Sequence, residues 1–202
     1  MRLSRILSLV GLLAFPVAGW ADEPPFGLHW GDTLEALTDR GIVVDILKND
    51  GKSLVLSAKH LRGTPAPQGS VQVIVNKTFG LQRVIWTSNE IGDTAFGTQG
   101  VAAYQDKKRN LSKDLGQPRF VAEEMWAESY SSPDQFYQCL GSDGCGTYMS
   151  KWRTDDGDVT LRLIAAPTAN RGQLQITYNG PSWEDISNGK SAKAKEQPGN
   201  RY

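Results

Sequence analysis

Histidine and cysteine, which supply much of the chemistry of enzymes and metal sites, are scarce in this chain. Its 202 residues include two histidines, His29 and His60, and two cysteines. A catalytic triad or a zinc site therefore has little material to draw on. The sequence also has no Gly-x-Ser-x-Gly elbow, phosphate-binding glycine loop or zincin helix. These absences predict that the protein binds no metal or cofactor, and they favour a non-enzymatic protein over an enzyme.

Runs of basic residues are missing as well. Lysine and arginine total 22, aspartate and glutamate total 22, and no arginine-rich stripe occurs. Lysine pairs such as Lys107-Lys108 are typical of a solvated helix face. A nucleic-acid-binding domain needs a concentrated basic surface. The sequence therefore predicts no nucleic-acid partner.

Long hydrophobic runs are confined to the start of the chain. Two arginines precede an apolar stretch from Ile6 to Ala18, and small residues follow it at 18–21. This pattern predicts a bacterial signal peptide over residues 1–21, a mature chain that begins near Asp22, and a periplasmic location. The apolar stretch is too short to cross a bilayer, and no cysteine follows it for lipid attachment. We therefore expect no stable membrane anchor.

The two cysteines, Cys139 and Cys145, are separated by five residues in the segment richest in turn-forming residues. In an exported protein such a pair is most simply a disulfide, and Gly141 and Gly144 can adopt the positive φ angles of a tight ring. Closing so small a loop stabilises the fold by about 2 kcal/mol in the chain-entropy model. Free thiols and a redox pair are the alternatives, although a redox pair favours Cys-x-x-Cys spacing.

The first half of the mature chain predicts one short helix followed by strands. A capping box at Asp32 and Glu35 starts the helix, and Gly41 ends it. The pattern then alternates with a period of two, and Asn49-Asp50-Gly51 forms a hairpin turn. The strands predicted there are residues 42–47, 53–56, 71–75 and 81–86, with a surface loop over 59–70.

The second half predicts a longer helix over 98–115, capped by Thr98 and ended by Gly116. A second capping box at residues 132–135 starts a short helix that ends at the cysteines. The strands predicted in this half are residues 120–127, 148–152, 159–163 and 174–178, although Glu123-Glu124-Met125 in the first of these also suits a helix. Residues 187–202 lack apolar periodicity and are predicted to be a disordered tail.

These elements predict an α+β fold, with antiparallel sheets and helices packed on one face. A helix followed by four strands occurs twice, first in residues 22–96 and again in residues 97–186. The order of elements therefore predicts two α+β halves, which form a duplicated helix-plus-four-strand unit, with the cysteine loop in the second half.

Two short segments carry a family resemblance. Trp30-Gly31-Asp32-Thr33-Leu34-Glu35-Ala36-Leu37, followed by Gly41, resembles the opening motif of small bacterial envelope domains of the SmpA/OmlA type, the outer-membrane assembly lipoproteins. The Leu-Gly-Gln-Pro ending of residues 111–118 resembles the way their helical part closes. The resemblance covers about 25 residues and implies an α+β envelope domain that binds other proteins. The chain lacks the lipid-attachment cysteine of that class.

The leading functional hypothesis is a periplasmic protein-binding module, such as an inhibitor or immunity-type protein. A short, stapled loop tip can enter a concave site on a partner at little ordering cost. Leu140 would supply an apolar contact there, and Ser142 and Asp143 would supply hydrogen-bond acceptors. The alternative is that the ring only fixes a corner between a helix and a strand.

A second hypothesis is an envelope enzyme or ligand binder that acts on cell-wall fragments. Glu124 or Asp93 would then line a groove together with tryptophans, although tryptophans on strands more often pack in a core. Five tryptophans lie beyond the predicted signal peptide: Trp30, Trp86, Trp126, Trp152 and Trp183. A third hypothesis, an accessory of outer-membrane assembly, follows from the family resemblance alone.

Overall fold

A computed structural model describes residues 23–62, 68–125, 132 and 135–189 of the protein. The predicted signal peptide, Trp126 and most of the predicted tail lie outside these residues. The strands are β1 (Val43–Asn49), β2 (Ser53–Lys59), β3 (Ser70–Asn76), β4 (Gly80–Thr87), β5 (Ile91–Gly92), β6 (Phe120–Met125), β7 (Gly146–Thr154), β8 (Gly157–Ala165) and β9 (Arg171–Asn179). The helices are α1 (Leu34–Asp39), α2 (Thr98–Leu115), α3 (Phe136–Leu140) and α4 (Trp183–Ser187).

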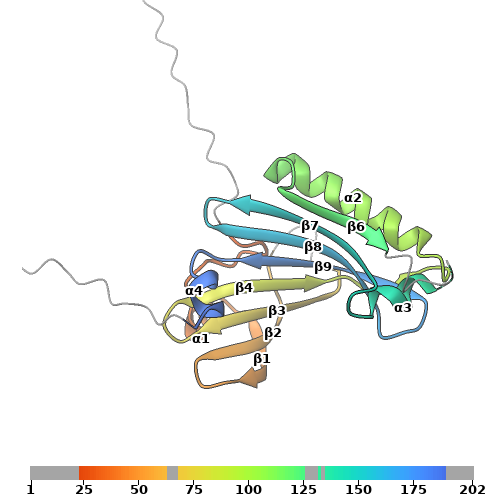
Figure 1. The fold of residues 1–202 in the computed structure, drawn as a ribbon. Coiled ribbons are helices and arrows are strands. Elements are labelled where there is room, and N and C mark those ends of the chain that lie inside the picture. Colours follow the sequence, from red (N-terminus) through yellow and green to blue (C-terminus); the bar gives the residue numbers. More distant parts are fainter. Residues whose placement is uncertain (1–22, 63–67, 126–131, 133–134, 190–202) are drawn as a thin grey trace, which may run out of the picture.

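All nine strands belong to one open antiparallel sheet, which confirms the α+β fold class with the sheet dominant (Figure 1). The strand order is β1-β2-β3-β4-β9-β8-β7-β6, and the short β5 pairs with β9. Each half of the chain contributes four neighbouring strands. The two halves meet where β4 pairs with β9, from Arg83–Asn179 to Thr87–Gln175.

Two hydrophobic cores lie on the same face of this sheet. Burial alternates along β3 and β9, as expected for strands that face a core on one side and solvent on the other. The first core contains residues of α1 and β1–β4, and the second contains residues of α2, α3 and β7–β9. Trp86 of β4 and Tyr178 of β9 pack against both cores, so they connect the two halves.

Three helices lie on the core face, but α4 does not. Leu37 of α1 belongs to the first core, while Tyr104 of α2 and Phe136 of α3 belong to the second. The Trp183 ring of α4 instead packs against Arg83, which points to the opposite face from its neighbour Val84. The prediction that helices pack on one face is therefore wrong for α4, a five-residue helix that follows the last strand. This helix also includes Ser187, the first residue of the predicted tail.

The bounds of α1 and α2 agree with the predictions, but their N-cap residues differ from those predicted. The N-cap of α1 is Thr33, whose hydroxyl accepts a hydrogen bond from the Ala36 N–H at 3.2 Å. Asp32 is occupied elsewhere, since it accepts from the His29 N–H and pairs with Arg40. In α2, the helix begins at Thr98 as predicted, but Gly97 holds the N-cap position with a φ of 74°.

Cys139 and Cys145 form a disulfide, with their sulfurs 2.00 Å apart. Both residues are buried, and the ring joins the end of α3 to the start of β7. The N-cap of α3 is Gln135, and Pro133 and Asp134 of the predicted capping box lie outside the described residues. Within the described ranges, no helix is both long enough and apolar enough to cross a membrane.

Candidate functional site

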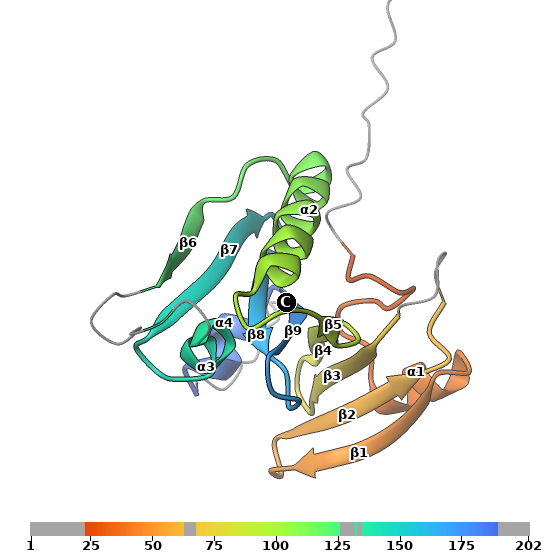
Figure 2. The same cartoon turned by 90° about the vertical axis from the view of Figure 1, so that its right-hand side faces the viewer.

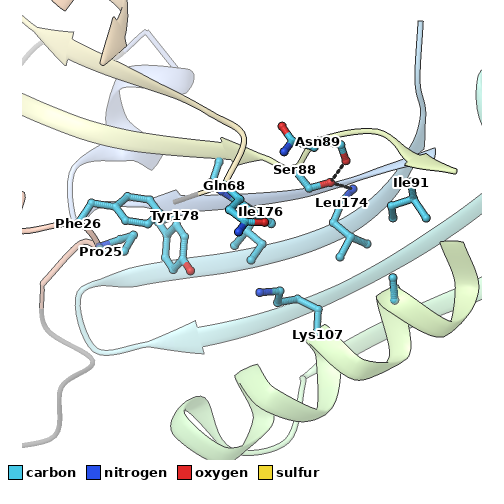
Figure 3. Close-up of a pocket in the computed structure, with 12 residues that line it drawn as sticks. Pro25, Phe26, Gln68, Ser88, Asn89, Ile91, Lys107, Leu174, Ile176 and Tyr178 are labelled. Carbon is cyan, nitrogen blue, oxygen red and sulfur yellow. Dashed lines mark hydrogen bonds between the residues drawn. The ribbon is translucent and has the colours of Figure 1, made fainter. Parts of the chain in front are cut away.

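A groove with a volume of about 530 Å³ lies on the core face of the sheet, above the line where β4 pairs with β9 (Figure 3). Strands β4, β5 and β9, helix α2, the N-terminal segment and the start of the β3 region contribute to it. The lining residues are Pro25, Phe26, Gln68, Trp86, Ser88, Asn89, Ile91, Ala103, Lys107, Leu174, Ile176 and Tyr178.

Alternation along two strands makes the floor of this groove apolar. Leu174, Ile176 and Tyr178 are every second residue of β9, so their side chains point to the same face. Trp86 of β4 lies directly opposite Ile176 across the strand pair. One wall is formed by Ala103 and Lys107 of α2. The groove thus occupies the place where the two cores meet, because Trp86 and Tyr178 pack against both. Figure 2 shows the helices of the two halves apart from each other, with α2 near β7 and β8 and α1 near β1 and β2.

The α2 wall is held by polar contacts along its length. In its middle, the buried hydroxyls of Tyr104 and Ser150 are hydrogen-bonded at 2.7 Å. Glu123 of β6 accepts hydrogen bonds from Lys108 at 2.6 Å and Gln105 at 2.9 Å. Burial alone would raise the pKa of the Glu123 carboxyl, but these bonds and the charge of Lys108 outweigh it and lower the pKa. Glu123 is therefore ionised at neutral pH and anchors the helix to the sheet.

The N-terminus of α2 is fixed by Asp93. Its carboxylate accepts hydrogen bonds from the Tyr137 hydroxyl at 2.7 Å and from the Gly100 N–H at 2.8 Å. Burial acts to raise the pKa of Asp93, yet the hydrogen bonds hold it below its usual value. Gly100 permits this approach, since a Cβ there would lie 2.3 Å from the Tyr137 hydroxyl oxygen. Asp93 is thus a helix cap.

The second hypothesis placed Asp93 or Glu124 in a groove, and neither lines the one described here. Glu124 is exposed on β6, and its register with Thr147 of β7 places it on the face opposite the cores. Neighbouring residues of a strand point to opposite faces, so Glu123 and Glu124 do not converge. The described lining of the groove includes no aspartate, glutamate, histidine or cysteine.

Ser88, Tyr178 and Lys107 are polar residues of the groove with different surroundings. The Ser88 hydroxyl donates to the Asn89 carbonyl at 2.8 Å and accepts from the Leu174 N–H at 3.0 Å, so it is engaged on both sides. Burial, aided by the negative charge of Asp114, raises the pKa of Tyr178 to about 12, and its hydroxyl stays neutral at physiological pH. The ammonium of Lys107 lies 5.1 Å from the centre of the Trp86 ring. Lys107 is the cation among the described lining residues.

The residues predicted to bind a partner at the disulfide ring have different environments. Leu140 packs against the second core. The Ser142 hydroxyl donates to the Gln138 carbonyl at 2.8 Å and so satisfies the end of α3. Asp143 is exposed to solvent. The contacts of Leu140 and Ser142 are those of a fixed corner, although Ser142, like Asp143, is exposed.

The tryptophans divide between packing and the groove. Trp152 is 1% exposed in the second core, and Trp30 packs against the first. Trp183 lies on the opposite face, which leaves Trp86 as the described tryptophan that lines the groove. Sequence reasoning overlooked Phe26 and Tyr178, and it assigned Lys107 to a solvated helix face.

The histidines have separate surroundings. His29 is half exposed and contacts Arg40 through its Nδ1. His60 is exposed in the loop after β2, with a φ of 57°. The parts of the chain that the structure describes contain no group of three or more histidine, cysteine, aspartate or glutamate side chains arranged to hold a metal ion.

Comparison with known proteins identifies no relative of this chain. No protein-family model matches the chain, and neither a curated protein nor a solved structure is significantly similar to it.

Proposed function

We propose that the protein is a non-enzymatic binding module of the bacterial periplasm, and that its groove holds an apolar segment of another envelope protein. The observation that carries this proposal is the composition of the groove. An apolar floor that includes Trp86, Ile176 and Tyr178 lies beside Lys107, the one cation among the described residues that line the groove.

The dimensions and chemistry of the groove fit a peptide segment. Its volume of about 530 Å³ is within the range of sites that bury several side chains or a small molecule. Tryptophan and tyrosine are the residues that most often dominate binding energy at protein interfaces. The ammonium of Lys107 lies beside Trp86 and would pair with a carboxylate of the bound segment. We therefore expect apolar side chains followed by an acidic residue or a free C-terminus.

The periplasmic location rests on the leader-like sequence of residues 1–21 and on the disulfide, because disulfides persist in oxidising compartments. The resemblance to SmpA/OmlA-type domains points to the same compartment. The segment that carries this resemblance, residues 30–37, includes Thr33, the N-cap of α1, and Trp30, which packs against the first core. An accessory role in outer-membrane assembly is the form of this proposal that the resemblance favours.

We also infer that the two halves, residues 22–96 and 97–186, derive from a duplicated helix-plus-four-strand unit. Each half has four neighbouring antiparallel strands and a helix on the same face. The fourth strands of the halves, β4 and β9, pair with each other, and the short β5 that ends the first half also pairs with β9. In this arrangement the groove would be the surface that joining two such units creates.

An inhibitor or immunity-type role is the narrower form of the binding proposal. It is supported by the exposure of Asp143 at the tip of the disulfide ring. Once a partner is known, Asp143→Arg should abolish binding if the ring enters the partner, and Ser142→Ala should weaken it. Unchanged affinity of both variants, with the fold intact, would remove the ring from the interface.

The groove is tested by filling it. Ala103 of α2 lines the groove, and its neighbour Ala102 is exposed and does not. Peptides selected by phage display would be measured for affinity by tryptophan fluorescence and calorimetry. Ala103→Trp should weaken binding by at least about tenfold, or 1.4 kcal/mol, while Ala102→Trp should leave it unchanged.

Two results would reject the groove as a peptide site. One is equal affinity of the Ala102→Trp and Ala103→Trp variants for the selected peptides. The other is binding of muropeptides, sensitive to Ala103→Trp, by a protein that binds no apolar peptide. The second result would replace the peptide with a cell-wall fragment as the ligand.

A further inference from the structure

The face of the sheet opposite the groove carries a second hollow, with a volume of about 590 Å³. Its floor comes from β4, β7, β8 and β9, and α4 borders it. Its charged lining residues are Arg83, Lys151, Arg153, Asp158, Arg162 and Glu184. Four cations and two carboxylates therefore line a hollow in a chain whose formal net charge is zero.

Strand register arranges these side chains in rows across the sheet. Arg153, Asp158, Asn179 and Arg83 are opposite one another on β7, β8, β9 and β4. Lys151 stands in the next row on the same face. Three strand spacings of about 4.8 Å place Arg153 and Arg83 roughly 14 Å apart at the backbone. The cations therefore cover an area rather than a line.

Arg83 is held in place before any partner binds. Its Nε donates to the Asn179 side-chain oxygen at 2.6 Å, and its guanidinium lies 3.5 Å from the centre of the Trp183 ring. The Asn179 amide in turn donates to Asp158 at 2.9 Å. Burial, opposed by the charge of Asp158, lowers the pKa of Arg83 to about 10, so it remains a cation at neutral pH. Asp158 is thus engaged with this network.

The other three cations are exposed and available. Lys151, Arg153 and Arg162 have no carboxylate within 4.0 Å among the residues that the structure describes. The Arg162 Nε is directed at the sulfur of Met149 at 3.4 Å, and Lys151 lies over the Phe120 ring. Elsewhere, arginines and lysines such as Arg40 and Lys108 are paired with acids.

We propose that this open face, defined by Arg83, Lys151, Arg153 and Arg162, is a second binding surface that docks the acidic surface of a partner protein. Charge complementarity identifies the partner, because four cations spread over neighbouring strands match a carboxylate-rich area. Arginine and tryptophan are also enriched at the centres of protein interfaces.

The charge of the sequence beyond α4 does not complement the open face. The sequence beyond α4 has four basic residues and one acidic residue: Lys190, Lys193, Lys195, Arg201 and Glu196. Its charge has the same sign as the open face, so it would be repelled from the surface and would add to the attraction for an acidic partner. The open face and the groove lie on opposite faces of one sheet, which allows both to be occupied together.

The test is charge reversal of Arg153→Glu together with Arg162→Glu, two exposed residues. The matched control is Lys52→Glu with Lys77→Glu, two exposed lysines at the β1–β2 and β3–β4 turns outside the hollow. The probe is poly-L-glutamate at low salt. The double arginine variant should lose at least about tenfold in affinity, and the control should change less than about twofold. Binding should also weaken as salt increases.

Three results would overturn the proposal: no binding of poly-L-glutamate by the unaltered protein, equal loss in the control variant, or tighter binding of heparin or anionic lipid vesicles. Heparin or vesicle binding would identify a sulfated glycan or a membrane as the ligand instead. The arginine variant should still bind groove peptides, so failure of this proposal and failure of the groove proposal are distinguishable.

Discussion

The two halves of the sheet are stabilised in different ways. The buried residues of the first core are all aliphatic, from Leu28 to Val84. The second core contains four buried aromatic residues, Tyr104, Phe136, Tyr137 and Trp152, and the disulfide lies beside it. The rings of Phe136 and Tyr137 meet edge to face at 5.1 Å. Non-directional packing therefore dominates in one half, and directional contacts contribute in the other.

The difference follows from the helix that each half must hold. Helix α1 is six residues long and buries Leu37. Helix α2 is 18 residues long and largely polar, and its fully buried residues are Gly100 and Tyr104. Its other apolar residues, such as Val101 and Leu111, are only partly buried against the second core, so hydroxyl and carboxylate groups also hold this helix. Because α2 forms one wall of the groove, these directional contacts help to set the shape of the groove.

The largest expected effects, and the strongest test of this difference between the halves, come from truncating one large buried residue in each core. Trp152→Ala should destabilise the protein by about 3–5 kcal/mol, because it leaves a cavity and removes the Nε1 bond to the Gly116 carbonyl at the end of α2. Leu56→Ala should cost about 2–5 kcal/mol. Urea unfolding measures both, and peptide affinity should fall more in the Trp152 variant. Equal loss of affinity at matched stability would show that the two halves support the groove alike.

Opening the disulfide is expected to have the next largest effect. Replacing Cys139 and Cys145 with alanine should lower the free energy of unfolding by about 2 kcal/mol, because the unfolded chain regains the freedom that the ring removes. Thermal unfolding with and without a reductant measures the change in the unaltered protein. Hydrogen exchange should increase around α3 and β7 and remain constant in β1–β3. An increase spread evenly over the sheet would contradict a local role.

A smaller effect should come from the hydroxyl pair beneath α2. Tyr104→Phe leaves the Ser150 hydroxyl buried without its partner and should cost about 1–3 kcal/mol. Adding Ser150→Ala should recover part of that loss, since no unpaired polar group then remains. Urea unfolding of both single variants and the double variant gives the coupling energy. Strict additivity would mean that the pair does not hold the helix.

Acid should weaken the attachment of α2 through Asp93. Its folded-state pKa is lowered, so its contribution to stability is complete above the unfolded pKa of about 3.9 and is lost as pH falls through the folded-state pKa. Asp93→Asn should therefore destabilise the protein at pH 7 and matter little at the acid end of the range. Unfolding between pH 7 and pH 2 checks this, with Asp155→Asn, an exposed turn residue, as a control. A pH-independent difference would contradict it.

Local patterns in the sequence predicted most of the sheet. The hairpin at Asn49–Gly51 is present, with Gly51 at a φ of 84°, and the second half ends in the predicted meander. Helix α2 has the predicted bounds of residues 98–115. These elements were accessible because alternation, turn residues and helical spacing act over a few neighbouring residues.

The groove could not be predicted in the same way. Its floor depends on the pairing of β4 with β9, whose residues Arg83 and Asn179 are 96 positions apart. Nothing local specifies such a pairing, and Phe26, Trp86 and Lys107 each fit an ordinary packing or surface role when taken alone. The cap of α2 was missed for a related reason, since Asp93 reaches the helix across a turn.

The place of β9 in the sheet has a consequence for how the protein assembles. This strand is the last of the nine to be synthesised, yet it occupies the middle of the sheet between β4 and β8. Until it arrives, β4 has a bare edge and the two halves share no backbone ladder. Pairing between strands so far apart in sequence slows folding. Until β9 pairs with it, the unpaired edge of β4 can also pair with strands of other chains. A nascent chain therefore completes the floor of the groove only when β9 is added.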